Sequence, residues 1–165
     1  MSSISVLILM GSDSDAPVMQ AAVDVLREFD VPCEMTVASA HRSPERVMRL
    51  VAEAPGRGVR LFIVGAGAAA HLGGVVAAHT TLPVIGVPID SSALKGMDAL
   101  LSTVQMPPGV PVATVSIGKP GATNAGVLAV QMLALADASL AERLTQYKRK
   151  LADKVEQAAA RLQQG

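Results

Sequence analysis

The sequence predicts an α/β fold of one domain, in which a five-stranded parallel sheet carries helices on both faces. The chain has 165 residues, of which 50% are apolar and 17% charged, which is enough for one full core. Short apolar runs alternate with segments of helix length, as in βαβ units. The runs V-L-I-L-M and L-F-I-V-G are apolar throughout rather than alternating, which is expected of strands buried on both faces.

The elements follow in order along the chain. Strands are expected at Ile4 to Met10, Cys33 to Val37, Arg60 to Gly65, Val84 to Val87 and Val112 to Val115. Crossover helices are expected at Asp15 to Phe29, Pro44 to Ala54, His71 to His79, Leu94 to Val104 and Gly121 to Ala136. Five parallel strands between two helical layers favour a three-layer, flavodoxin-like arrangement. Ligands of such sheets bind at the carboxyl ends of the strands, so the loops after the first three strands form the candidate site.

The last segment, 139–165, predicts a long amphipathic C-terminal helix. Its apolar residues recur at helical spacing: Leu140, Leu144, Tyr147, Leu151, Val155 and Leu162. Such a helix lies either on its own domain or across a neighbouring subunit, and the helix alone leaves both open. The middle of the chain favours assembly, because only Asp90, Lys95 and Asp98 are charged between Leu61 and Ser116. No linker or repeat interrupts residues 1–165, so we expect one domain whose C-terminal helix packs on a neighbouring subunit.

Composition excludes several classes of partner. Fourteen basic residues balance fourteen acidic ones, so the net charge is zero and no field attracts nucleic acid or an anionic membrane. Aromatic residues make up only 2%, too few to stack unpaired bases. Residues 61–89 carry no charge, but glycine, proline and histidine break this stretch into pieces too short to span a membrane. We expect neither nucleic acid nor a membrane as partner.

The single cysteine indicates a reducing compartment. Cys33 cannot form an internal disulfide, and the N-terminus lacks the features of a secretory signal, so we expect a cytoplasmic protein. Cys33 itself is expected as a buried, inert thiol within a strand. The three histidines and one cysteine show no metal-ligand spacing, so no metal site is expected.

The first candidate loop reads G-S-D-S-D, Gly11 to Asp15, between a strand and a helix. Ser12, Ser14 and the free N–H groups of the helix N-terminus suit an anion such as phosphate, while Asp15 suits ligand hydroxyls. Serine and aspartate are also common helix caps. A third interpretation, in which Asp13 and Asp15 hold magnesium for phosphoryl transfer, requires a further acidic cluster that the chain lacks.

The second loop reads S-A-H-R-S-P, with Ser39 and Ala40 before His41 and Arg42. His41 is a candidate proton carrier, and a helix N-terminus beside Arg42 favours its neutral, proton-accepting form. Arg42 can bind a phosphate through two hydrogen bonds. The alternative is that His41 and Arg42 are ordinary surface groups.

The third loop, Gly65 to Gly74, has two interpretations. Gly65, Gly67 and Ala70 match a dinucleotide-binding pattern, with Asp90 about 20 residues on, which would suit a nicotinamide-dependent oxidoreductase. That pattern normally follows the first strand of a domain. We favour the second interpretation, in which small residues form a floor that a ligand approaches closely. His71 would then lie at the start of the next helix, or it would have a purely structural role. A non-catalytic nucleotide-binding module is a further alternative.

The three loops together resemble the PurE family, the bacterial class I N5-carboxyaminoimidazole ribonucleotide mutases of purine biosynthesis. The resemblance covers nearly the whole chain. Its motifs are M-G-S-D-S-D (10–15), S-A-H-R-S-P (39–44), G-A-G-A-A-A-H-L (65–72), P-V-I-G-V-P (83–88), V-Q-M-P-P-G-V-P-V-A-T (104–114) and N-A-G-V-L-A (124–129). Where the family usually has G-A-G-G-A-A-H-L-P-G-M, this chain has Ala68, Gly73 and Val75.

The resemblance implies a reaction without metal or cofactor that moves a carboxylate from an exocyclic nitrogen to the neighbouring ring carbon of an aminoimidazole ribonucleotide. It implies that His41 moves the proton. Substrate binding would fall to Gly11, Ser12, Ser14, Asp15, Ser39, Ala40, Arg42, Gly67, Ala68, Ala69, His71 and Leu72. Among these, Ser12, Ser39 and Arg42 would hold the phosphate, Asp15 the ribose, and the third loop the imidazole.

Two further expectations follow from the resemblance. The family forms homo-octamers and is linked in function to the ATP-dependent synthetase that carboxylates the substrate. Within the family, the alternative is a carboxylase that uses free carbon dioxide and unmodified aminoimidazole ribonucleotide. The sequence A-H-L at 70–72 and the long terminal helix favour the mutase.

Overall fold

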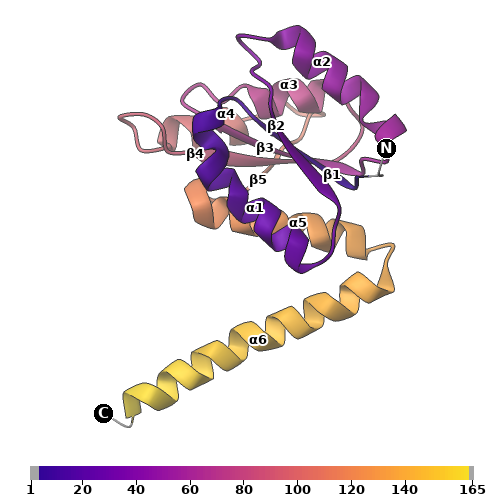
Figure 1. The fold of residues 1–165 in the computed structure, drawn as a ribbon. Helices are drawn as coiled ribbons and strands as arrows, with labels where there is room; N and C mark the ends of the chain where they lie inside the picture. Colours follow the sequence, from indigo (N-terminus) through magenta and orange to yellow (C-terminus); the bar gives the residue numbers. More distant parts are fainter. Residues whose placement is uncertain (1–3, 164–165) are drawn as a thin grey trace. The chain divides into compact units, whose positions relative to one another are not determined.

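The computed structural model describes residues 4–163 and confirms the predicted parallel sheet (Figure 1). The strands are β1 (Val6–Met10), β2 (Cys33–Val37), β3 (Leu61–Gly67), β4 (Val84–Ile89) and β5 (Ala113–Thr114). Their order is β2-β1-β3-β4-β5, and every neighbouring pair is parallel. This is the flavodoxin-like order that the sequence predicts.

Helices connect the strands as crossovers. They are α1 (Ala16–Glu28), α2 (Pro44–Glu53), α3 (Leu72–Ala78), α4 (Met97–Val104) and α5 (Gly118–Ala134), with short 3₁₀ turns at Asp13–Asp15 (η1) and Pro55–Arg57 (η2). Proline at the first or second position begins both α1 and α2, where a missing N–H removes no helical hydrogen bond. Both helices therefore start directly behind the loops that the sequence singles out.

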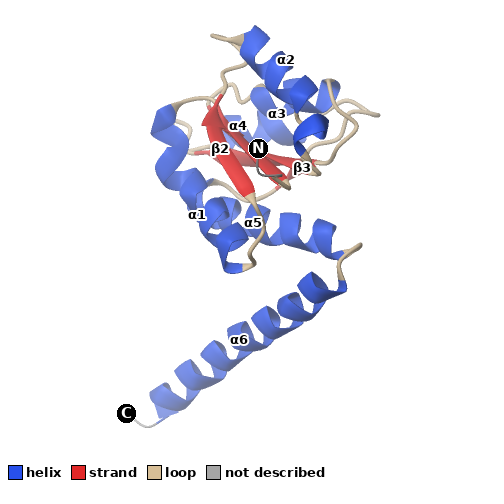
Figure 2. Ribbon diagram, turned by 45° about the vertical axis from the view of Figure 1, so that its right-hand side comes forward, coloured by secondary structure: helices blue, strands red, loops and turns tan. Residues whose placement is uncertain are grey.

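The helices form a layer on each face of the sheet (Figure 2). On one face, Leu7, Leu9, Phe62 and Val64 of the sheet form a buried cluster with residues of α2, α3 and α4. On the other face lie α1 and α5, which approach each other so closely that a side chain at Gly126 would overlap Val25. Every residue of β1 and β4 is buried, as continuous apolar runs predict.

The strand order reverses direction between β1 and β3. From β1 the chain crosses to β2 on one side, and from β2 it crosses back to β3 on the other. The loops leaving β1 and β3 diverge at this point and leave a crevice at the carboxyl edge of the sheet. Residues 11–15 and 68–72 follow these two strands, so the topology brings the first and third candidate loops together.

Two local expectations need correction. Leu94 is not helical, because Lys95 (φ 52°) and Gly96 (φ 83°) adopt left-handed conformations that delay the start of α4 to Met97. Cys33 is half-buried rather than buried, because β2 is an edge strand whose residues all keep partial exposure. Burial still raises the pKa of the Cys33 thiol, and Arg27 opposes this shift.

The chain divides into two compact units, which we describe separately: the described residues up to Ala129, and those from Val130 onward. The second unit contains α6 (Ala138–Gln163), whose N-terminus is capped by Asp137, since its Oδ1 accepts from the backbone N–H of Ser139 (2.9 Å) and Leu140 (3.2 Å). None of the described residues of α6 is buried. Within residues 4–163, no helix is both long and apolar enough to cross a membrane.

Candidate active site

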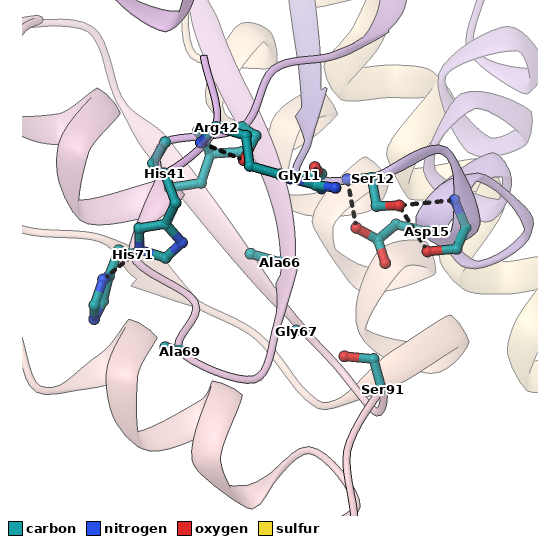
Figure 3. A pocket seen from close by; sticks show the side chains of 14 residues that line it. Gly11, Ser12, Asp15, His41, Arg42, Ala66, Gly67, Ala69, His71 and Ser91 are labelled. Carbon is teal, nitrogen blue, oxygen red and sulfur yellow. Dashed lines mark hydrogen bonds between the residues drawn. The ribbon is translucent and has the colours of Figure 1, made fainter. Parts of the chain in front are cut away.

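One cavity of about 200 Å³ brings the three candidate loops together (Figure 3). It is lined by Gly11, Ser12, Ser14, Asp15, Ser39, Ala40, His41, Arg42, Ala66, Gly67, Ala69, His71, Leu72 and Ser91. Twelve of these were singled out from the sequence. Ala68 alone among the predicted residues does not line the cavity, while Ala66 and Ser91 line it without having been predicted.

The first loop is held by its own side chains. Ser12 caps η1 and Asp15 completes a capping box, in which the backbone N–H of Ser12 donates to Asp15 Oδ2 at 3.1 Å. The exposed carboxylate of Asp13 accepts from the Ser14 backbone N–H at 3.0 Å. Both carboxylates thus stabilise the loop, and the hydroxyls of Ser12 and Ser14, 2.9 Å apart, lie at the cavity.

Asp15 is the one buried carboxyl group of the cavity, with 6% of its surface exposed. Burial raises the pKa of Asp15 above its ordinary value of 3.8, while the Ser12 backbone N–H and the positive charge of Arg42 oppose this shift. The carboxyl group accepts one hydrogen bond, from the Ser12 backbone, and lines the cavity. Such a group is suited to accept hydrogen bonds from the hydroxyls of a ligand.

Arg42 joins the second loop to the first. Its guanidinium donates from Nη2 to the Gly11 carbonyl oxygen at 2.8 Å, and its Nε lies 3.4 Å from Ser39 Oγ. Ser39 Oγ also accepts from the Arg42 backbone N–H at 3.2 Å, which fixes the turn at the N-terminus of α2. Arg42, Ser39 and Ser12 therefore present one positive charge and two hydroxyls on the same side of the cavity, which is a suitable set for a phosphate.

His41 joins the second loop to the third. Its Nε2 lies 2.7 Å from His71 Nδ1, and the rings meet edge to face with centroids 4.8 Å apart. One of these nitrogens donates and the other accepts, so a single proton lies between the rings. Both rings are exposed at the cavity, where a proton can pass to or from a ligand.

The third loop forms the floor of the cavity with small residues. Gly65 and Gly67 lie within β3, paired with Val87 and Ile89 of β4, rather than in a turn between strand and helix. That geometry does not fit the dinucleotide-binding interpretation, whose first glycine makes the turn itself. The floor leaves room for a flat ligand above Ala66 and Gly67.

A second, larger cavity lies at the amino end of β4 and has a volume of about 470 Å³. None of its lining residues, which include Thr80, Thr81, Leu82 and Pro111, has a titratable side chain. The smaller cavity, which has titratable side chains in its lining, is therefore the better candidate for an active site. Across residues 4–163, no group of three or more His, Cys, Asp or Glu side chains is arranged to hold a metal ion.

Comparison with known protein families matches residues 5–154 to the family described as AIR carboxylase. The chain belongs to the AIR carboxylase family. It is 58% identical over 137 residues to the Bacillus subtilis protein named N5-carboxyaminoimidazole ribonucleotide mutase, covering 83% of this chain and 85% of that protein. It is also 51% identical over 156 residues to the Candida glabrata phosphoribosylaminoimidazole carboxylase, covering 94% of this chain and 27% of that longer protein.

A solved structure agrees with this assignment. The crystal structure of Treponema denticola PurE matches with a TM-score of 0.83 at 29% identity, covering 92% of this chain and 94% of that one. The agreement extends the likeness to the AIR carboxylase family from sequence to three-dimensional fold.

Ala68, Gly73 and Val75, which differ from the motif of the resemblance, lie in or directly after the third loop. Ala68 adopts φ 51°, a left-handed conformation that favours glycine. Gly73 is buried in α3, and an added Cβ would make ordinary contact with Val112 at 3.7 Å. The loop thus keeps the conformation that a glycine would allow, with an alanine under strain.

Proposed function

We propose that the protein is a mutase that converts N5-carboxyaminoimidazole ribonucleotide to 4-carboxy-5-aminoimidazole ribonucleotide in de novo purine biosynthesis. The observation that carries the proposal is the cavity itself, which combines a side suited to phosphate with a histidine pair. The chain that forms it belongs to a family in which a 58% identical relative carries the mutase name.

In this proposal each of the three loops binds a different part of the substrate. Arg42, Ser12 and Ser39 hold the 5′-phosphate, and Asp15 accepts hydrogen bonds from the ribose hydroxyls. The backbone around Gly67 to Leu72 faces the imidazole and its carboxylate. Supporting this order, Ser12, Ser39 and Arg42 also line one adjoining pocket together, and in Figure 3 the small residues Ala66 and Gly67 lie between His41 and Ser91.

His41 carries the proton. It protonates the exocyclic nitrogen as the N–C bond of the carbamate breaks and carbon dioxide is released into the cavity. The ring carbon then attacks carbon dioxide, forming the new C–C bond, and His41 removes the proton that this carbon still bears. One proton leaves and returns, so the reaction balances with a single group acting first as acid and then as base.

We also propose that the protein works as a homo-oligomer, an octamer by its resemblance to the family. The exposed faces support this. Leu94, Met97, Leu101 and Val104 are about half exposed or more in and just before α4, and α6 exposes Val155 and Leu162. Faces of this kind on a monomer normally contact other chains. We propose that residues 1–165 act as one domain whose α6 packs on a neighbouring subunit, so that neighbours help to retain carbon dioxide.

The closest rival is a carboxylase that uses free carbon dioxide, the activity named for the Candida glabrata relative. The test is product formation by the purified protein with N5-carboxyaminoimidazole ribonucleotide in one cuvette, and with aminoimidazole ribonucleotide plus bicarbonate in another. The mutase is expected to react rapidly only with the first substrate. Rapid reaction with the second at low bicarbonate contradicts the mutase, and no reaction with either favours a binding module.

The variant His41→Asn distinguishes an enzyme from a protein that only binds the nucleotide. It keeps the approximate size and one hydrogen bond of the side chain but cannot carry the proton. We expect kcat to fall by about 100- to 10,000-fold while product still binds. Activity that survives this change would contradict the role of His41.

The proposed substrate indicates which reaction precedes this one. The proposed enzyme consumes the product of an ATP-dependent carboxylating synthetase, which links the two in function. The free thiol of Cys33 is compatible with the reducing cytoplasm, where we expect the protein to act without cofactor.

A further inference from the structure

Ser91 is a polar residue of the cavity to which none of the proposed roles gives a function. It follows β4 by two residues, so it reaches the cavity from a fourth loop, at the carboxyl end of a fourth strand. Its side chain is exposed, and its hydroxyl has no hydrogen-bond partner within residues 4–163. A hydroxyl in this position is available to a ligand.

The structure holds this hydroxyl in a defined place. A Cβ atom at Gly67 would collide with Ser91 Oγ and would lie only 2.8 Å from Ser91 Cβ, so the serine occupies the space that a side chain at Gly67 would fill. Gly67 in turn is fixed in the sheet by its pairing with Ile89. Ser91 therefore rests directly on the floor of the cavity.

The loop that carries Ser91 is also fastened at its far end. The neighbouring Ser92 hydroxyl donates to Asp98 Oδ2 at 2.7 Å, and this hydrogen bond lowers the pKa of Asp98. Ser92 Oγ also accepts from the Leu94 backbone N–H at 3.1 Å. These bonds connect the loop to the first turn of α4, which limits the positions that Ser91 can take.

Ser91 and His41 lie on opposite sides of the floor. In Figure 3, Ala66 and Gly67 separate Ser91 from the His41 and His71 pair. In Figure 3, Asp15 lies on a third side of this floor, away from both His41 and Ser91. The reacting edge of an aminoimidazole carries the exocyclic nitrogen and the adjacent carbon, and in the proposed reaction it faces His41. With the ribose-bearing nitrogen on the side of Asp15, the unsubstituted ring nitrogen lies on the remaining flank of the ring, toward Ser91.

We propose that Ser91 is a further substrate-binding residue, whose hydroxyl donates a hydrogen bond to the unsubstituted ring nitrogen of the imidazole. This inference rests on the proposed function, because it takes the ring orientation from the role of His41. The ring nitrogen accepts this bond both before and after the carboxylate moves. Ser91 therefore contributes to binding and orientation rather than to the chemical step.

The experiment compares two ligands that differ in the base. Affinities of aminoimidazole ribonucleotide and of ribose 5-phosphate are measured by calorimetry for the wild type and Ser91→Ala. We expect Ser91→Ala to weaken the first by about tenfold and to leave the second unchanged, since ribose 5-phosphate has no imidazole ring. In turnover, KM should rise by a similar factor with kcat nearly constant.

Ser116→Ala serves as the matched control, because Ser116 is an exposed serine that does not line the cavity. Equal weakening of both ligands by Ser91→Ala, or no weakening of either, would overturn the inference. If Ser91→Ala fails to fold, Ser91→Cys replaces it, with a weaker donor of similar size and the same expected selectivity. Absence of turnover by the wild type contradicts the proposed function instead, and the two affinities still decide the role of Ser91.

Discussion

His41 Nε2 and His71 Nδ1 are 2.7 Å apart, although the two residues come from loops that follow different strands. The contact fixes the orientation of the His41 ring, and it supplies a second site for the proton that His41 carries in the proposed reaction. A proton carrier held in this way keeps its geometry through both halves of the proposed reaction.

Loss of this contact should slow the reaction more than it weakens binding. We expect His71→Ala to lower kcat by about tenfold or more, because a misoriented base transfers its proton less effectively. The control is His79→Ala, which removes a histidine whose ring bonds the Val75 carbonyl outside the cavity. Steady-state kinetics measure both, and equal kcat values for the two variants would show that the His41–His71 contact is not used.

Asp15 should make stability fall with rising pH. Its pKa is raised in the folded protein by burial, so between its ordinary value of 3.8 and the raised value the folded state holds a proton that the unfolded chain has released. In that window stability declines as pH rises, and above it the loss is complete. Asp15→Asn should remove the decline and melt at a higher temperature than the wild type at neutral pH.

The same change should weaken substrate binding by about tenfold or more, because the amide accepts hydrogen bonds from ribose less strongly than a carboxylate. Thermal denaturation across the pH range and calorimetry provide the two readouts. Asp13→Asn controls for net charge, since Asp13 is an exposed carboxylate of the same turn. A lower melting temperature for Asp15→Asn at neutral pH would mean that its hydrogen bond to Ser12 outweighs the burial of its charge.

Ala68→Gly should stabilise the protein. Ala68 adopts φ 51°, a conformation that disfavours a Cβ atom by about 1 kcal/mol and that glycine adopts freely. Ala69→Gly is the matched control, because the neighbouring alanine has no positive φ and gains only disorder in the unfolded chain. Urea denaturation of both variants is the measurement, and a less stable Ala68→Gly would contradict the strain.

The exposed face of α4 should be an interface. We expect the wild type to sediment well above the 16.9 kDa of a single chain, and Leu101→Glu to sediment as a smaller species, because a charge replaces a half-exposed apolar side chain. Leu101→Ala removes apolar surface without adding charge and should give an intermediate effect. Circular dichroism confirms that each variant folds, and a monomeric wild type would exclude the interface.

The sheet and its switch point could be predicted because the strands are long apolar runs. In a chain of this size, few other structures can bury such runs. Edge strands were harder: β2 keeps partial exposure throughout, so Cys33 is more accessible than an apolar run suggests. The start of α4 was also misplaced, since nothing in the sequence marks Lys95 as left-handed. Such local conformations depend on packing that the sequence does not display.

Most of the cavity lining could be predicted because its polar residues follow strand ends in short motifs. Ser91 was missed because only the loops after the first three strands were considered, although the carboxyl end of β4 lies at the same edge of the sheet. The Arg42 to Gly11 hydrogen bond and the approach of His41 to His71 join residues 31 and 30 positions apart. Their distances require coordinates, because motif spacing reports only local neighbours.

Helix α4 has two faces with different surroundings. Its apolar side is exposed, while on another side the Ser102 hydroxyl lies 3.4 Å from the carbonyl oxygen of Ala68 in the third loop. If neighbouring chains hold α4, they also limit the motion of the floor that is proposed to support the imidazole. Dilution would then lower the rate per subunit and not only the number of subunits, so specific activity would rise with protein concentration until the assembly is complete.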